Sequence, residues 1–318
     1  MWSAELLTAA PTIQFDPKQL IGIPFALVGA VFMSIGAQLQ HRGVGKVEQA
    51  SVSVEKSSLN LKQLFALLSR PSWLFGTVML GLAVVFQLVS LGYSPIMVVQ
   101  PIGAVALVLT AIINSRVSKV KLNKASVIAI VMCVGGIGIF VTVAAFTAVN
   151  APVETQDLIE ILVTLGFALT IFALAYILLR KRRSNLFFIM GAGVLYGFVA
   201  TLAKVVEARL FNNQMDPLLW LSLAGLLVAA IIGGLFVQNA YSSGPPDLVI
   251  AGLTVIDPLV AVCIGIVILD EASQAPAWAV AVYVLAGAIA VAGVLLMSRV
   301  HPQSSGETGE VPRLSNPA

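Results

Sequence analysis

The residue of this sequence with the clearest chemical potential is Asp257, an aspartate inside the apolar segment 247–269. At about 1.5 Å per residue, a helix over this segment would place Asp257 near the middle of a lipid bilayer. A carboxylate at that depth costs at least about 2.5–3.5 kcal/mol, so we interpret it as a group that binds a cation or proton in a watery cavity. The next residue, Pro258, lacks a backbone N–H and would kink the helix, freeing a carbonyl as a further ligand. The alternative is a structural aspartate held by Lys204 or by backbone donors.

Lys204 is the other charged residue that lies well inside an apolar segment. The favoured interpretation is that its ammonium reaches toward the membrane surface beside Glu207, because a long side chain can extend its charge out of the apolar layer. The sharper alternative is that Lys204 pairs with Asp257 or binds an anionic substrate.

Neutral polar residues inside other apolar segments could help to recognise a solute. They are Gln38, Gln87, Gln100, Gln238, Tyr93 and Tyr196. Amides donate and accept hydrogen bonds, but they equally connect helices to each other, at about 0.6 kcal/mol each. Gln100 ranks first among them because it precedes Pro101 as Asp257 precedes Pro258, and Pro101, like Pro258, is expected to kink its helix. For both tyrosines, simple packing is the favoured role and a place in a cavity wall is the alternative.

The composition shows which kind of protein must position these residues. The 318 residues are 58% apolar and only 10% charged, whereas soluble domains are about 45–50% apolar and about 25% charged. A membrane-spanning helix needs roughly 20 apolar residues, and we find nine such segments. They cover residues 20–40, 72–93, 95–114, 125–148, 157–179, 186–208, 217–239, 247–269 and 275–298. We therefore expect an all-α, polytopic membrane helix bundle with about nine transmembrane helices.

The charges predict the orientation of this bundle. All Lys and Arg residues except Lys18, Lys204 and Arg209 lie in the first, third and fifth loops between segments or in the C-terminal region. The other loops carry acidic residues instead. Because cytoplasmic loops of membrane proteins are enriched in Lys and Arg, we expect the N-terminus outside and the C-terminus in the cytoplasm, in the plasma (inner) membrane.

Weak internal similarity indicates two halves of inverted topology. Gln100-Pro101 in the third segment corresponds to Asp257-Pro258 in the eighth, and the two sets of helices start on opposite sides of the membrane. Shared Gly/Ala-rich composition is the alternative explanation. The expected organisation is a tail over 1–19, a first half over 20–148 with a cytoplasmic loop at 41–71, a connector over 149–185, a second half over 186–299 and a disordered tail over 300–318.

The stretch from Leu253 to Val262, followed by Gly265 and by Leu269-Asp270-Glu271, resembles the penultimate-helix motif of the drug/metabolite transporter superfamily (EamA-like permeases). The nine-segment layout and the Gln100-Pro101-Ile102-Gly103-Ala104 stretch are more similar to its NIPA-like magnesium-transporter branch. The resemblance implies a membrane carrier. This chain departs from the superfamily in the first half, where Ser115-Arg116-Val117-Ser118 stands in place of a loop with glutamate.

We predict a secondary transporter that moves a small polar solute or a cation by alternating access, as inverted repeats are typical of such carriers. Mg²⁺ transport ranks second. Mg²⁺ usually keeps several waters and takes one or two carboxylates, and the single carboxylate of Asp257 is a small ligand set for selective binding of Mg²⁺. A non-transporting scaffold in envelope assembly is the third hypothesis. We expect no enzymatic activity, no cofactor and no nucleic-acid partner. The expected transported or coupling ion is H⁺, Na⁺ or Mg²⁺. The expected partners are membrane lipid and the transported solute or ion, and the sequence is compatible with a homodimer.

Overall fold

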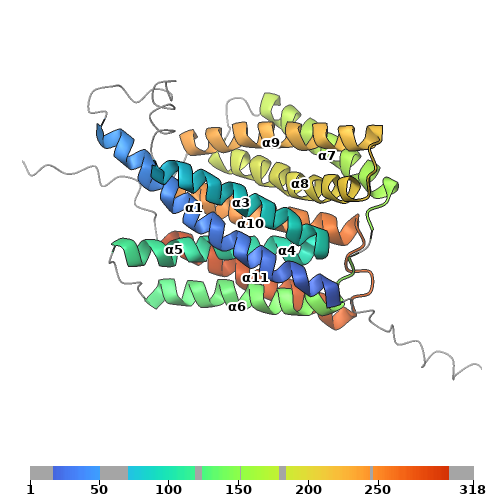
Figure 1. The fold of residues 1–318 in the computed structure, drawn as a ribbon, viewed down its shortest axis with the longest axis horizontal. Coiled ribbons are helices and arrows are strands. Elements are labelled where there is room, and N and C mark those ends of the chain that lie inside the picture. The colour runs from blue at the N-terminus through green and yellow to red at the C-terminus, as the bar shows by residue number, and fades with distance from the viewer. Residues whose placement is uncertain are drawn as a thin grey trace, which may run out of the picture.

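The computed structural model describes residues 17–50, 71–118, 124–150, 152–178, 184–243 and 246–300. Within these ranges every regular element is helical, as expected (Figure 1). The elements are η2 (Pro17–Ile21), α1 (Gly22–Ala50), α3 (Pro71–Tyr93), α4 (Ile96–Gly103), α5 (Val105–Ser118), α6 (Lys124–Thr147), α7 (Thr155–Leu178), α8 (Asn185–Phe211), α9 (Pro217–Ser243), α10 (Pro246–Val267) and α11 (Ala277–Val300). Most of the expected tails, and most of the expected loop over 41–71, lie outside the described residues.

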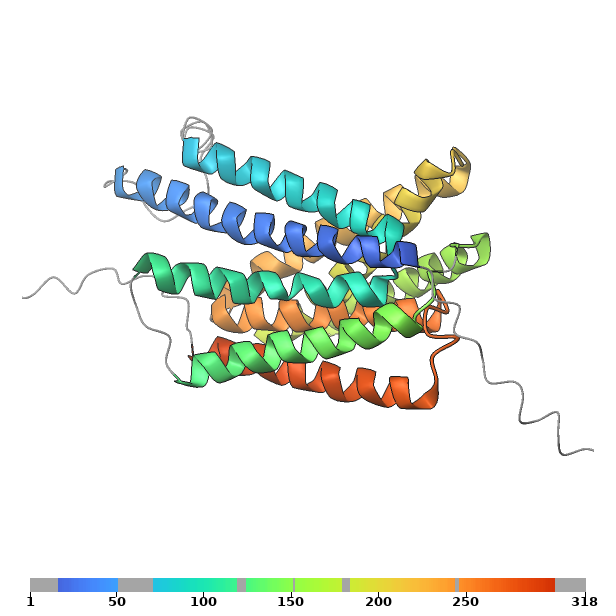
Figure 2. The same cartoon turned by 60° about the horizontal axis from the view of Figure 1, so that its bottom comes forward.

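Nine helices in the described part of the chain are long and apolar enough to cross a membrane, and this confirms the predicted count. Figures 1 and 2 show that they run roughly along one common direction, as a membrane bundle requires. Large apolar side chains cover the outside of the bundle, including Phe167 at 65% exposure and Ile171 at 62%. In a bilayer these side chains would contact lipid rather than water.

The two ends of the bundle differ in what they carry. One end, which we call the Tyr93 end, holds the turn over 93–95, the connection between α6 and α7, the turn between α8 and α9, and the loop between α10 and α11. The other end, which we call the basic end, holds the exposed side chains of Arg116, Lys124 and Arg299.

Helix contacts in the second half repeat those in the first. α1 packs along α3, as α8 packs along α9, and α1 contacts α4 and α5 as α8 contacts α10. The halves meet through α4 against α10 and through α6 against α11. A duplication related by an approximate two-fold axis would give this set of contacts. The inverted repeat remains a prediction, and the contact pattern is consistent with it.

The third membrane span is broken, although the sequence suggested one helix over 95–114. α4 ends at Gly103 and α5 begins at Val105, so Ala104 lies between them. The cause is Pro101, which has no N–H to donate to the carbonyl of Met97. The chain tightens at this point, with Ala104 N–H donating to the Pro101 carbonyl at 3.1 Å. The corresponding Pro258 leaves α10 continuous.

Close contacts between helices depend on glycine where no side chain would fit. A Cβ atom at Gly136 of α6 would lie 2.7 Å from the backbone carbonyl oxygen of Ala286 in α11. At Gly293 of α11, a Cβ atom would lie 2.5 Å from the backbone nitrogen of Cys133 in α6. α6 and α11 therefore touch backbone to backbone, which small residues allow in membrane helices.

Candidate functional site

Asp257 lies on the side of α10 that faces α8, inside the bundle. Its Oδ1 atom is buried, and no donor among the described residues lies within hydrogen-bonding distance of it. A buried polar atom without a partner is costly, so a native protein retains one mainly where a ligand, ion or proton completes it. The carboxyl is neither turned toward lipid nor paired with Lys204, the two arrangements that would have argued against a binding role.

α8 approaches Asp257 through two glycines one turn apart. A Cβ atom at Gly193 would meet Ile256 at 2.6 Å, and one at Gly197 would meet Val260 at 2.7 Å and the Asp257 carbonyl oxygen at 3.1 Å. Between them, Tyr196 is close enough to interact electrostatically with Asp257. The structure therefore brings together two of the predicted site residues, Asp257 and Tyr196.

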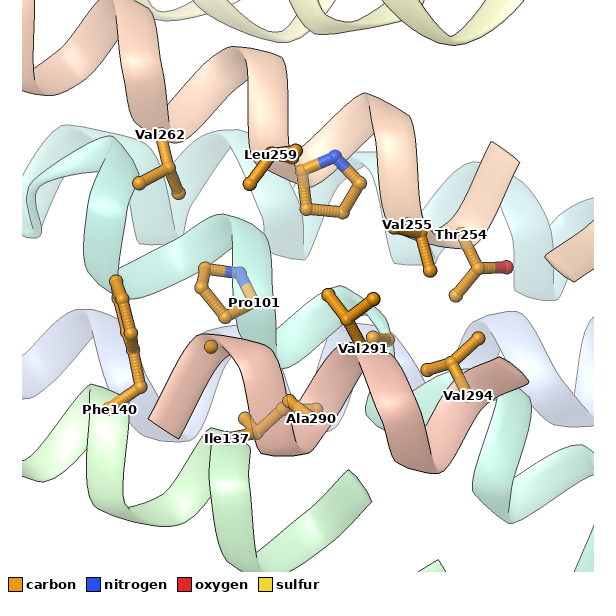
Figure 3. Close-up of a pocket in the computed structure, with 13 residues that line it drawn as sticks. Pro101, Ile137, Phe140, Thr254, Val255, Leu259, Val262, Ala290, Val291 and Val294 are labelled. Atoms are coloured by element: carbon orange, nitrogen blue, oxygen red, sulfur yellow. The ribbon is translucent and has the colours of Figure 1, made fainter. Parts of the chain in front are cut away.

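A cavity of about 90 Å³ lies on another face of α10. Figure 3 shows that its walls come from α4, α6, α10 and α11, with Pro101, Phe140 and Leu259 among the labelled side chains. Pro101 and Pro258, which the sequence comparison matched, both line it. Among its described lining residues Thr254 contributes the only hydroxyl side chain, and the lining is almost entirely apolar.

Helical geometry explains why Asp257 does not line this cavity. With 3.6 residues per turn, the lining residues Thr254, Pro258 and Val262 follow one stripe of α10. Asp257 precedes Pro258 by about 100° around the helix axis, which directs it toward α8. Because Pro258 has no N–H, the carbonyl of Thr254 lacks its helical hydrogen bond and is one more oxygen available for a ligand.

Lys204 is buried at the Tyr93 end, and its partner is Glu271. The Lys204 ammonium donates to Glu271 Oε1 at 2.8 Å and to Asn150 Oδ1 at 3.0 Å. The exposed fraction of the side chain is 5% for Lys204 and 1% for Glu271. Lys204 thus does not extend to the membrane surface, and its alternative pairing with Asp257 is also wrong, because Glu271 satisfies its charge.

Glu271 also caps a helix. Its Oε1 accepts a hydrogen bond from Ile96 N–H at 2.7 Å and its Oε2 accepts one from Met97 N–H at 2.8 Å, at the first turn of α4. The helix dipole and unpaired N–H groups at a helix start favour a carboxylate there. Sequence reasoning did not place Glu271 in the site. Its position in the family-like Leu269-Asp270-Glu271 stretch was the available signal.

The remaining predicted residues differ in their burial. Gln100 is buried on α4 at 6% exposure, while Tyr93 is 44% exposed and Gln238 is exposed on α9. Gln38 on α1 and Gln87 on α3 are partly buried, on helices that pack along each other.

A second ion pair at the Tyr93 end stands apart from this site. Arg209 donates to Asp216 Oδ2 at 2.7 Å, and Asp216 Oδ1 accepts from Leu219 N–H at 3.1 Å at the start of α9. Desolvation of the carboxyl acts to raise its pKa, but the hydrogen bonds from Arg209 and Leu219 together outweigh it. The pKa of Asp216 therefore lies below its ordinary value.

Within the described residues, no group of three or more His, Cys, Asp or Glu side chains could hold a metal ion. A metal at Asp257 would thus be bound by one carboxylate, backbone oxygens and water. Such a loose ligand set suits an ion that passes through a protein better than one that resides in it.

The nine apolar helices and the carboxylate kept inside them define a multi-pass membrane protein with a polar site in its bundle. Residues 17–301 match the family described as Magnesium transporter NIPA, so the chain belongs to that family and is a membrane transporter. This confirms the resemblance to the NIPA-like branch seen in the sequence; the family is one of transporters, not of enzymes.

A relative from Corynebacterium glutamicum, the uncharacterized protein Cgl0250/cg0304, is 24% identical over 291 residues. The alignment covers 90% of this chain and 98% of the relative. No solved structure matches the chain.

Proposed function

We propose that this protein transports Mg²⁺ across the plasma membrane, with Asp257 as the residue that binds the ion inside the bundle. The observation that carries the proposal is the buried Oδ1 atom of Asp257, which has no hydrogen-bond partner among the described residues. The family to which the chain belongs is described as one of magnesium transporters, which makes Mg²⁺ the first cation to test.

The chemistry of Asp257 fits a cation that keeps part of its water. Mg²⁺ dehydrates reluctantly and is usually held by one or two carboxylates together with water. Asp257 supplies one carboxylate, and the Thr254 carbonyl that Pro258 leaves without a helical partner can supply a neutral oxygen. Tyr196 is close enough to interact electrostatically with Asp257.

We further propose that transport proceeds by alternating access, with the ion exposed first to one side of the membrane and then to the other. The repeated contact pattern of the two halves supports this mechanism, because rocking of one half against the other, at the α4–α10 and α6–α11 contacts, would open the bundle toward one side at a time. The exposed Arg and Lys side chains at the basic end favour a cytoplasmic location for that end, with the N-terminus outside. The membrane potential would then draw Mg²⁺ inward.

The broader hypothesis of a carrier for small polar solutes receives less support. The cavity between α4, α6, α10 and α11 offers, in the part of the chain that the structure describes, Thr254 as its only hydroxyl side chain. A polar solute enclosed there would lose hydrogen bonds to water without replacement, which costs several kcal/mol.

Flux into liposomes tests the proposal. Purified protein reconstituted with an internal Mg²⁺-sensitive dye should admit Mg²⁺ when a potential, negative inside, is applied. Asp257→Asn, which has nearly the same shape without the charge, should lower the rate at least tenfold while the protein stays monodisperse. Asp216→Asn is the matched control, since its carboxyl is partly exposed outside the bundle.

Mg²⁺ flux that Asp257→Asn leaves unchanged would refute the role of this residue. Absence of flux for Mg²⁺ and for other cations in the folded wild-type protein would favour the scaffold hypothesis instead.

A further inference from the structure

Glu271, at the Tyr93 end of the bundle, forms hydrogen bonds with several helices at once. Its carboxylate accepts hydrogen bonds from the first turn of α4 and from Lys204 on α8. Its backbone carbonyl accepts from Val149 N–H at 2.8 Å, and its own N–H donates to the Gly265 carbonyl of α10 at 3.0 Å. One residue therefore holds α4 and the end of α6, from the first half, against α8 and α10, from the second.

The hydrogen-bonded group around Glu271 lies on the same side of α10 as Asp257, farther toward the Tyr93 end. Asp257, Ala261 and Gly265 follow one another at intervals of one turn on the same side of α10, and Gly265 adjoins the Glu271 carboxylate. Over these eight residues the helix rises about 12 Å. Ala261 is fully buried. A route from Asp257 to the Tyr93 end along this side of α10 thus ends at the Lys204–Glu271 pair.

The groups around the pair are closely packed. A Cβ atom at Gly265 would lie only 2.7 Å from Glu271 Oε2, and one at Gly92 only 2.5 Å from Glu207 Oε1. Asn150 completes the closure, because its Nδ2 donates to the Tyr93 carbonyl at 3.2 Å while its Oδ1 receives the Lys204 ammonium. Separation of the two halves at this end must break the hydrogen bonds from Ile96 N–H and Met97 N–H to the Glu271 carboxylate.

We propose that Glu271 is a latch that closes the Tyr93 end of the transport pathway: its carboxylate, positioned by the Lys204 ammonium, holds the first turn of α4 until the halves part. This inference rests on the proposed transport through the site at Asp257. A purely structural ion pair would stabilise the fold equally well, but its loss would leave access to residues near Asp257 unchanged.

Cysteine accessibility tests the latch without any measurement of flux. In a Cys263→Ser background, Ala261→Cys supplies a reporter between Asp257 and the latch, and the native Cys133 is buried. A small charged thiosulfonate reagent is applied to sealed proteoliposomes. Gln214→Cys, exposed in the turn between α8 and α9, identifies molecules whose Tyr93 end faces the reagent.

With an intact latch, Ala261→Cys should react slowly from the Tyr93 end. Lys204→Met should accelerate the reaction at least tenfold from that end, and Lys204→Arg, which keeps the charge, should restore slow labelling. Gly265→Ala provides a second route, since its methyl group displaces the Glu271 carboxylate while every charge remains. It should also accelerate labelling, so the test stands even where Lys204→Met fails to fold.

Asp216→Asn is the matched control, because it removes an ion pair at the same end but outside the α8–α10 contact. Its labelling rate should equal that of the unaltered reporter protein. Unchanged labelling in folded Lys204→Met or Gly265→Ala protein would overturn the latch. Acceleration in the Asp216→Asn control would overturn it as well. Because labelling needs no transported ion, a latch that opens in a protein without Mg²⁺ flux would refute the Mg²⁺ proposal alone.

Discussion

The buried pair of Lys204 and Glu271 should show strong energetic coupling in a double-mutant cycle. Lys204→Met removes the ammonium but leaves Glu271 with its hydrogen bonds from Ile96 N–H and Met97 N–H. Glu271→Gln is more disruptive: the amide has one acceptor oxygen for three donors, and its NH₂ group must face one of them. It also leaves the ammonium buried without a counter-charge.

The structure sets the magnitudes. Loss of the 2.8 Å charge-assisted hydrogen bond in Lys204→Met should lower the free energy of unfolding by about 2–3 kcal/mol. Glu271→Gln should lower it by about 3–5 kcal/mol, as for other buried pairs that lose one partner. In the double variant no ammonium remains to be stranded, so the effects should fall short of additivity by about 1.5–3 kcal/mol.

Reversible unfolding in mixed micelles, with increasing sodium dodecyl sulfate and tryptophan fluorescence as the signal, measures these differences. The control is the corresponding cycle with Arg209→Met and Asp216→Asn, whose carboxyl is 41% exposed and whose coupling should be clearly smaller. Additivity within about 0.5 kcal/mol for Lys204 and Glu271 would refute the reasoning, since independent sites add to that extent.

Three further perturbations test the packing and electrostatics of the bundle. Gly136→Ala should lower the free energy of unfolding by about 1–3 kcal/mol because its Cβ would meet the backbone of α11, whereas Gly135→Ala, with open space around it, should not; equal effects would contradict the packing of α6 on α11. Tyr283→Phe removes the buried hydrogen bond to Thr147 and should cost about 0.5–1.5 kcal/mol in the same unfolding assay, against no loss if the contact is absent in solution. Asp216 has a lowered folded-state pKa, so its contribution to stability is present above its unfolded-state pKa and is lost as the pH falls through the folded-state pKa. The difference in thermal midpoint between wild type and Asp216→Asn should therefore be present at pH 7 and shrink in acid. A difference that grew in acid would contradict a lowered folded-state pKa of Asp216.

Much of the architecture could be predicted because the bilayer imposes a simple rule on each helix. Each span needs about 20 apolar residues, so its location is visible in the chain without knowledge of its neighbours. The expected segments 72–93 and 95–114 leave room only for a short turn between them, and α3 and α4 are joined by such a turn. A kink was expected at Pro101, and the structure has a break just after it; a proline inside a membrane helix permits either, and neighbouring helices decide between them.

The site was predicted in part for a related reason. Asp257 was evident because a carboxylate in an apolar segment is costly wherever its side chain points. The partner of Lys204 was not evident, since Glu271 lies 67 residues away and reaches Lys204 only through the loop after α10.

The sequence by itself therefore determined the nine spans, the uneven distribution of charge and the presence of an acidic group inside the membrane. Only the tertiary structure decided that Asp257 faces α8 rather than the apolar cavity, and that Lys204 pairs with Glu271 at the first turn of α4. The physical reason is that the lipid-facing and protein-facing sides of these helices are both apolar. Hydrophobicity then shows that a segment spans the membrane, but which side of the helix meets a neighbour depends on close packing between residues distant in the chain.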